Sequence, residues 1–151
     1  MMDRAYEKGV IPYCQEHNIG FVAFSPIASG YLSGKVDPNQ TFTGDDVRQW
    51  VPQLKKENML ANRPLLEVLS DIAARKHATN AQISLAWMLR KYPHVVPIPG
   101  SKNKGRILEN LGAWEVELSD GEFQELEDAL GRIAIHGQRS DLGNRTEFID
   151  A

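Results

Sequence analysis

Two short, wholly apolar runs limit most strongly what this chain can fold into. Residues 19–24 (IGFVAF) end at a Ser-Pro pair, and residues 95–98 (VVPI) end at a Pro-Gly pair. Runs of this length without polar alternation are typical of strands buried on both faces of a parallel sheet. Two helix patterns separate them, so the order along the chain is βα, repeated twice. The sequence therefore predicts two parallel strands, at about residues 19–24 and 95–98, with flanking helices.

Turn and capping signals predict the helices before and between the two strands. Residues 3–17 are helix-like, although Pro12 is expected to break or restart the helix partway. Residues 63–77 carry a strong helix pattern, with Pro64 in the first turn and Asn62 as the expected cap. The apolar stripe of residues 63–77 is predicted to form an inner face, and Cys14 lies in an apolar stripe with Val10 and Ile11.

Two capping boxes, at residues 79–82 (TNAQ) and 119–122 (SDGE), open two further predicted helices. Residues 37–58 are polar and irregular, and a segment of this length is typical of a lid or flap. The last residues of the chain show no periodicity. We therefore predict one domain over residues 1–133, followed by a C-terminal tail over residues 134–151.

Two strands are too few for a free-standing parallel sheet. Each strand would have an unpaired outer edge, although strands of this kind normally lie inside a larger sheet. We expect both outer edges to be covered in the ordered protein. The chain is therefore expected to be part of a larger α/β fold, either because its gene is truncated or because another chain supplies the rest.

The residues after the second strand form a basic turn that leads into a helix. A hydroxyl group and three cations follow Gly100 within six residues: Ser101, Lys102, Lys104 and Arg106. Spacings of three and four place Arg106, Glu109 and Asn110 on one helix face. Cations at a helix N-terminus oppose the helix dipole, whereas backbone N–H groups there attract anions. A phosphate site is the sharper interpretation, and a solvated basic turn is the alternative.

The motif IPGS-K-x-x-x-R-I-x-E-N in residues 98–110 resembles the last strand and coenzyme loop of the aldo-keto reductases, a (β/α)8-barrel family that uses NADP(H). Residues 10–34 resemble its seventh strand and pyrophosphate loop, and residues 78–89 the helix before its eighth strand. Residues 137–139 are similar to the G-x-R of its C-terminal tail. The resemblance implies an α/β fold, the C-terminal part of a (β/α)8 TIM barrel that is incomplete by itself.

The resemblance implies a coenzyme site, with NADP as the cofactor, in the loops after the two strands. The matching positions line the pyrophosphate and ribose (Ser25, Ile27, Gly30), hold the adenosine 2′-phosphate (Ser101, Lys102, Arg106) and face the adenine (Glu109, Asn110). The planar fork of Arg106 can donate two hydrogen bonds to one phosphate. Gly100 stands where some members have a lysine, so one phosphate contact is absent.

The resemblance also implies that the catalytic half is absent. In this family a tyrosine, tuned by a paired lysine and aspartate beside a histidine, donates the proton, and all four lie on the first half of the barrel. A tyrosine with the ordinary pKa of about 10 is a poor acid at neutral pH. Tyr31, in the first loop, better fits packing or substrate lining than catalysis. No catalytic residue is assigned, and the isolated chain is expected to be inactive.

Three functions from different classes stay open. The first is an oxidoreductase, an NADP(H)-dependent aldo-keto reductase that reduces a small carbonyl substrate in the intact barrel. The second is a non-catalytic NADP(H)-binding or interaction module, as in the channel β-subunit branch of the family. The third is a remnant that assembles through its strand edges, as an oligomer or with a complementing chain. Turnover would favour the first function, NADP(H) binding without turnover the second, and oligomers without binding the third.

Composition argues against several other classes. A net charge of −3 disfavours nucleic acid as the main partner, despite the local basic cluster. No apolar run reaches membrane-spanning length, and residues 1–4 do not resemble a signal peptide, so a cytoplasmic location is expected. The single Cys14 excludes an internal disulfide and is expected to be a buried, inert thiol. No metal site is expected, because the histidines lack metal-ligand spacing: His17, His77, His94 and His136.

Overall fold

The computed structural model describes residues 1–139 and contains one parallel sheet of two strands, β1 (Phe21–Phe24) and β2 (Val95–Ile98). The predicted parallel pair is therefore confirmed, although β1 begins two residues later than expected. The reason is a helix-ending turn: Asn18 adopts a left-handed φ of 54°, and Ile19 N–H donates to Cys14 O at 2.7 Å. This is the bond that closes a Schellman motif, so Ile19 ends the helix instead of starting the strand.

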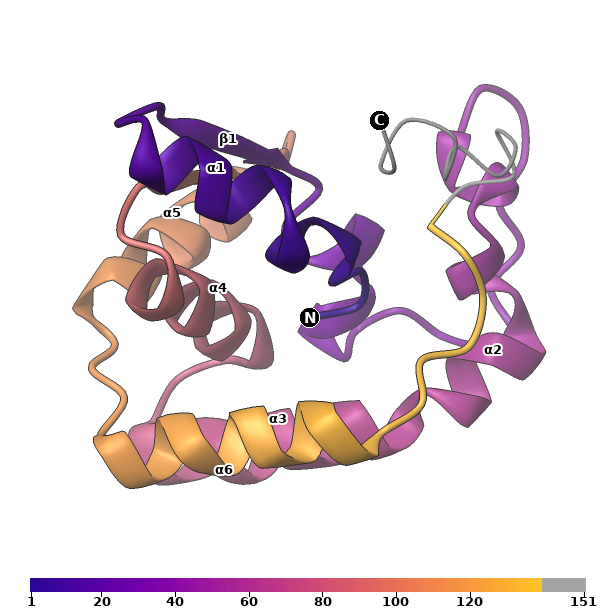
Figure 1. The fold of residues 1–151 in the computed structure, drawn as a ribbon. Helices are drawn as coiled ribbons and strands as arrows, with labels where there is room; N and C mark the ends of the chain where they lie inside the picture. Colours follow the sequence, from indigo (N-terminus) through magenta and orange to yellow (C-terminus); the bar gives the residue numbers. More distant parts are fainter. Residues whose placement is uncertain (140–151) are drawn as a thin grey trace.

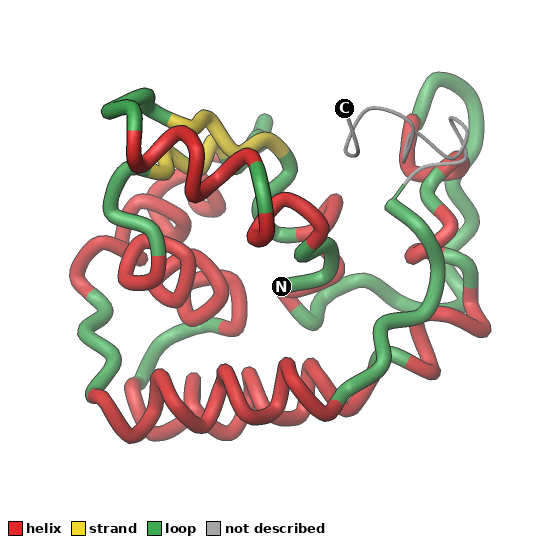
Figure 2. The backbone as a smooth tube through the Cα atoms, viewed as in Figure 1, coloured by secondary structure: helices red, strands yellow, loops and turns green. Residues whose placement is uncertain are grey.

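Helices make up most of the described chain (Figure 2). The α-helices are α1 (Val10–Glu16), α2 (Lys56–Ala61), α3 (Arg63–Lys76), α4 (Asn80–Lys91), α5 (Lys104–Leu111) and α6 (Asp120–Arg132). Short 3₁₀ helices span Ala5–Lys8, Ala28–Ser33, Val47–Trp50, Pro52–Leu54 and Gly112–Glu115. Helix α4 contacts both β2 and α3, and α6 lies along α3 (Figure 1) and also bonds α4 through Glu127. The order of layers is thus sheet, α4, and then the α3–α6 pair.

Local signals predicted the helix starts well at some positions and poorly at others. Both capping boxes are confirmed: Thr79 Oγ1 accepts from Gln82 N–H at 3.3 Å, and Ser119 Oγ accepts from Glu122 N–H at 3.3 Å. The expected interruption of the helix over residues 3–17 is present, but Pro12 is not its position. The interruption lies at Gly9, and Pro12 sits in the first turn of α1, where no intrahelical N–H bond is required.

Asn62 does not cap α3, which corrects the expectation from its position. It has helical φ and ψ angles and makes no side-chain cap bond. Its side chain is fully buried and bonds the backbone of the C-terminal segment instead: Oδ1 accepts from His136 N–H and Nδ2 donates to His136 O, each at 2.8 Å. Residues 140–151 of the predicted tail lie outside the described residues.

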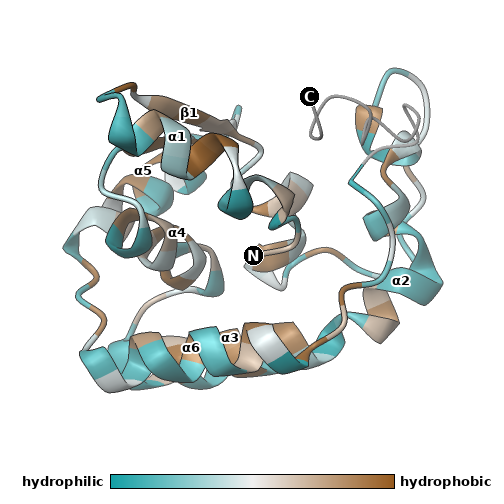
Figure 3. Ribbon diagram, viewed as in Figure 1, coloured by the Kyte–Doolittle hydropathy of each residue, from teal (hydrophilic) through white to brown (hydrophobic). Residues whose placement is uncertain are grey.

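The core lies between the first loop, α3, α4 and α6. Its largest fully buried apolar side chains are Trp87, Tyr31, Leu32, Leu65, Leu69, Ile72, Ile83 and Leu126. Figure 3 shows α6 with hydrophobic and hydrophilic positions along its length, as expected for a helix with one face against this core. In α3, the buried residues Leu65, Leu69 and Ile72 belong to the apolar stripe predicted for residues 63–77, so this stripe faces the core.

The sheet is covered on one face only, so the prediction of strands buried on both faces is wrong for this chain. Val22, Phe24, Val96 and Ile98 alternate with covered neighbours and are 59%, 65%, 54% and 51% exposed. Within residues 1–139, neither outer edge pairs with a further strand. Two strands cannot curl far enough to enclose their second face, so this face stays open to solvent.

Acid should weaken the α3–α6 contact through Glu122. Lys76 Nζ lies 2.8 Å from Glu122 Oε2, and the hydrogen bonds from Lys76 and then from Ser119 N–H lower the pKa of Glu122 from 4.5 to about 2. Because the folded-state pKa is depressed, this stabilisation is present above pH 4.5 and is lost as the pH falls through about 2.

We expect Glu122→Gln to reduce the free energy of unfolding at neutral pH by at most about 1 kcal/mol and to flatten its decline between about pH 5 and 2. Urea unfolding at each pH measures this change. Glu67→Gln, on the exposed side of α3, is the matched control and should retain the acid dependence of the parent. An unchanged decline in Glu122→Gln would contradict the prediction.

Candidate functional site

The two loops predicted to bind a coenzyme begin side by side. In the parallel register Phe24 pairs with Ile98, so Ser25 and Pro99 leave the sheet at the same carboxyl edge. This edge is where α/β barrels and open α/β sheets place their ligand sites. The tertiary structure therefore brings together two loops that are more than 70 residues apart in the chain.

The first loop contains an unusual run of left-handed backbone. Ser25, Ala28 and Ser29 have φ angles of 50°, 50° and 54°, and Gly30 follows at 98°. Only Gly30 adopts this region without a steric cost, so three residues with side chains are held there by their surroundings. Ser25 accepts from Ser29 N–H through Oγ at 3.1 Å and from Ala28 N–H through its carbonyl oxygen at 3.0 Å.

Strained backbone of this kind persists where structure and function require it. The small side chains keep the loop backbone accessible to a ligand at close range. The coenzyme-binding role of Ser25 and Gly30 stays a prediction, and the left-handed conformation of Ala28 and Ser29 was not predicted. No signal could have found it, since neither residue type favours positive φ.

Tyr31, the next residue along the loop, belongs to the core. Its side chain is 2% exposed, and its hydroxyl donates to Met59 O at 2.7 Å. Burial raises the pKa of Tyr31 to about 12. A phenol with a raised pKa is a still poorer acid at neutral pH, which supports the packing role expected for it.

In the second loop, the backbone is organised by neutral side chains. Ser101 Oγ accepts from Asn103 N–H at 3.1 Å, and Asn103 Oδ1 caps α5 by accepting from Arg106 N–H at 3.1 Å. Lys102 and Arg106 are exposed, and within residues 1–139 no hydrogen bond or ion pair engages either side chain. Both cations are therefore available to an anionic ligand, because the fold does not use them.

An ion pair links the two loops. Lys35 follows the left-handed Gly34 at the end of the first loop, and its Nζ lies 3.0 and 3.3 Å from the two carboxylate oxygens of Glu109 on α5. Half-buried Asn110 is the next residue on α5. Sequence reasoning missed Lys35, because nothing local indicates a partner 74 residues away.

Two residues outside these loops, Asp46 and Cys14, take part in the local structure of the fold. Asp46 caps the 3₁₀ helix Val47–Trp50 and pairs with Arg48, whose hydrogen bonds lower the pKa of Asp46 to about 2. Cys14 is buried as expected. Among residues 1–139, no three His, Cys, Asp or Glu side chains gather closely enough to hold a metal ion. No helix in that part of the chain has the length and apolar character needed to cross a bilayer.

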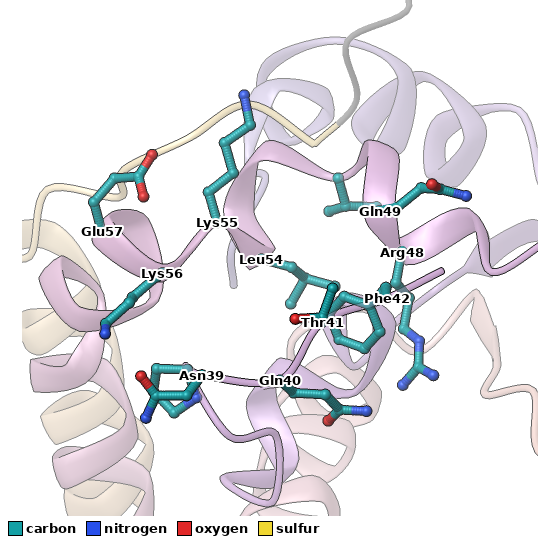
Figure 4. A pocket seen from close by; sticks show the side chains of 12 residues that line it. Asn39, Gln40, Thr41, Phe42, Arg48, Gln49, Leu54, Lys55, Lys56 and Glu57 are labelled. Carbon is teal, nitrogen blue, oxygen red and sulfur yellow. The ribbon is translucent and has the colours of Figure 1, made fainter. Parts of the chain in front are cut away.

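A pocket of about 610 Å³ lies within the segment predicted as a lid or flap and is lined by residues between 38 and 57. Figure 4 shows Arg48, Lys55 and Lys56 on its rim, with their charged ends pointing away from one another. Phe42 and Leu54 provide apolar lining. Without converging polar groups, this pocket does not define a site for a charged ligand.

Comparisons of sequence connect this geometry with known proteins. The model of the aldo/keto reductase family matches residues 1–130. Aldo-keto reductase yakc [NADP(+)] of Schizosaccharomyces pombe is 35% identical over 137 residues, which are 91% of this chain and 40% of that protein. Probable aldo-keto reductase 1 of Glycine max is 33% identical over 136 residues, 90% of this chain and 39% of that protein. The chain thus spans about two fifths of the length of these curated relatives.

Solved structures agree on the fold. The glycerol dehydrogenase of Gluconobacter oxydans superposes with a TM-score of 0.76 at 25% identity, over 89% of this chain and 41% of that one. A thermostable aldo-keto reductase in complex with the inhibitor epalrestat gives a TM-score of 0.56 at 28% identity, over 84% of this chain and 36% of that one. The two parallel strands and their helices thus form part of an aldo-keto reductase barrel without closing it. With a family match over residues 1–130 and this fold, the chain belongs to the aldo/keto reductase family.

Proposed function

We propose that this chain is the coenzyme-binding part of an NADP(H)-dependent aldo-keto reductase, which in the intact barrel reduces a small carbonyl compound to an alcohol. The observation that carries the proposal is the pairing of Phe24 with Ile98, which places a strained small-residue loop beside a loop with two unengaged cations. The name of the Schizosaccharomyces pombe relative, which includes NADP(+), supports this choice of coenzyme.

The donor set fits a phosphorylated dinucleotide. Ser25, Ile27 and Gly30 would line the pyrophosphate and ribose, where a small-residue backbone permits close approach. Ser101, Lys102 and Arg106 would hold the 2′-phosphate, since charged donors bind phosphate more strongly than neutral ones. Glu109 and Asn110 would face the adenine, and the Glu109 carboxylate also pairs with Lys35. When bound, the coenzyme supplies the hydride for carbonyl reduction.

None of the four tyrosines, which all lie within residues 1–139, is placed to donate the proton for that reduction at the carboxyl edge. Tyr31 is buried with its pKa raised to about 12, and burial followed by the charge of Glu7 also raises the pKa of Tyr92. Of the other tyrosines, Tyr6 and Tyr13 lie before β1, on the first helical segments. The proposed catalytic group therefore belongs to another part of the barrel.

We expect the purified chain to bind NADPH but to reduce no small aldehyde above background. Loss of NADPH absorbance with a small aldehyde measures turnover, and fluorescence titration measures binding. A complete aldo-keto reductase treated in the same way is the positive control. Turnover that persists after host reductases have been removed would contradict the assignment of catalysis to residues outside this chain.

The exposed sheet face favours a second candidate function, association with further strands. Val22, Phe24, Val96 and Ile98 present an apolar surface beside two unpaired strand edges. Such edges are templates for pairing with another chain or a second copy. Sedimentation at several concentrations distinguishes the candidates: oligomers that form without NADPH binding would favour a self-assembling remnant, whereas NADPH binding without turnover favours a coenzyme module.

A further inference from the structure

The segment that follows α6 runs past α2 (Figure 1), and the side chain of Arg139, its last described residue, reaches Phe24 at the end of β1. It is fixed at two points on the way. The buried side chain of Asn62 makes two hydrogen bonds of 2.8 Å to the backbone of His136. Gly137, at a φ of 81°, lies so close to the 37–58 segment that a Cβ atom there would be 2.9 Å from Gln53 N and 2.7 Å from Asn58 Nδ2. These contacts direct Arg139 toward β1.

Arg139 engages the residue at which the first loop begins. Its Nη2 donates to Phe24 O at 2.8 Å, and its guanidinium carbon lies 3.8 Å from the centre of the Phe24 ring. Phe24 ends β1, and its side chain is 65% exposed. The contact therefore holds both the carbonyl group and the ring of the residue that precedes Ser25, the first left-handed position of the loop.

We propose that Arg139 is a positioning residue for the coenzyme loop. By holding Phe24, it restricts the backbone from which the strained turn at Ser25–Ser29 must start. A loop that is already ordered loses less conformational freedom when a ligand binds, so positioning increases affinity without direct contact. This inference rests on the proposed function, because the affinity concerned is that for NADPH.

The first measurement is amide hydrogen exchange in the unliganded chain, followed by mass spectrometry. Arg139→Ala should accelerate exchange in peptides covering residues 21–32 and leave those of α3 unchanged. Arg139→Lys keeps the charge and a donor but not the planar group, so it should restore part of the protection. Arg132→Ala, which removes an exposed arginine from the last turn of α6, is the matched control and should behave as the parent does.

The second measurement is NADPH affinity, by fluorescence titration. Arg139→Ala should bind NADPH about 2- to 12-fold more weakly than the parent, because the substitution removes the net contribution of one hydrogen bond. Arg132→Ala should bind as the parent does, and Arg139→Lys should lie between the two. NADH affinity should fall by the same factor, because the loop contacts the part common to both coenzymes.

The outcomes separate this inference from the proposed function. Unchanged exchange in residues 21–32 of Arg139→Ala would overturn the positioning role, whether or not the chain binds NADPH. Faster exchange throughout the chain would overturn it as well, since it would show a general contribution to stability. Weaker NADPH binding with unchanged exchange would show that Arg139 contacts the coenzyme directly and does not position the loop. Failure of the parent to bind NADPH would overturn the proposed function alone.

Discussion

Arg106→Ala should weaken NADPH binding by roughly 10- to 150-fold, while NADH affinity changes much less. The guanidinium of Arg106 is exposed at the start of α5, and its backbone N–H is already satisfied by the Asn103 cap. Truncation therefore removes a phosphate donor and leaves the helix start intact. A hydrogen bond to a charged group contributes roughly 1.5–3 kcal/mol, which corresponds to this range of affinity.

A matched control and a salt series sharpen this test. Lys104→Ala removes another cation from the same turn, at a position not assigned to the phosphate, and should have a much smaller effect. Added salt should reduce NADPH affinity more in the parent than in Arg106→Ala, because screening acts on the charge pair that the substitution removes. Equal losses for NADPH and NADH would show that Arg106 supports the loop or the adenine, and not the 2′-phosphate.

Trp87→Ala should lower the free energy of unfolding by about 3–5 kcal/mol. The Trp87 side chain is 1% exposed in α4, and its indole N–H donates to Glu127 Oε1 on α6 at 2.6 Å. Lys91 Nζ lies 5.1 Å from the ring centre and 2.5 Å from Glu127 Oε2, so the ring is packed within a group of paired charges. Truncation leaves a cavity and removes a donor from a partly buried carboxylate.

Trp114 offers a control of the same residue type. Its side chain is 81% exposed, so Trp114→Ala should change the free energy of unfolding by no more than about 0.5 kcal/mol. Urea unfolding followed by circular dichroism measures both variants against the parent. Similar losses for the two substitutions would contradict the core assigned between α4 and α6.

Features that depend on neighbouring residues could be predicted from the sequence. The capping boxes at Thr79 and Ser119 need only residues three positions apart, and both formed as expected. The apolar runs predicted two parallel strands, and the Gly-Ser-Lys turn identified the start of α5 as a candidate phosphate site. The strands and the capping boxes could be predicted because helix starts and strand patterns are short-range properties, whereas the phosphate site at the start of α5 stays a prediction.

Asn62 shows where such reasoning fails. Its type and position are those of a helix cap, yet its side chain bonds the backbone of His136, 74 residues later. The Asn62 side chain can bond either the start of its own helix or a distant backbone segment. Because it is 0% exposed, its amide group must bond the polar backbone that the fold places beside it. No local pattern contains that information.

Residue types and short spacings in this chain were enough to predict the βα repeat and the helices that open with capping boxes, and the resemblance of the two loops indicated the family. The geometry of the candidate site required the folded chain, since the register of Phe24 with Ile98, the Lys35–Glu109 ion pair and the Arg139–Phe24 contact join distant residues. Local propensities act over a few residues, whereas contacts of this kind depend on how all the layers pack together.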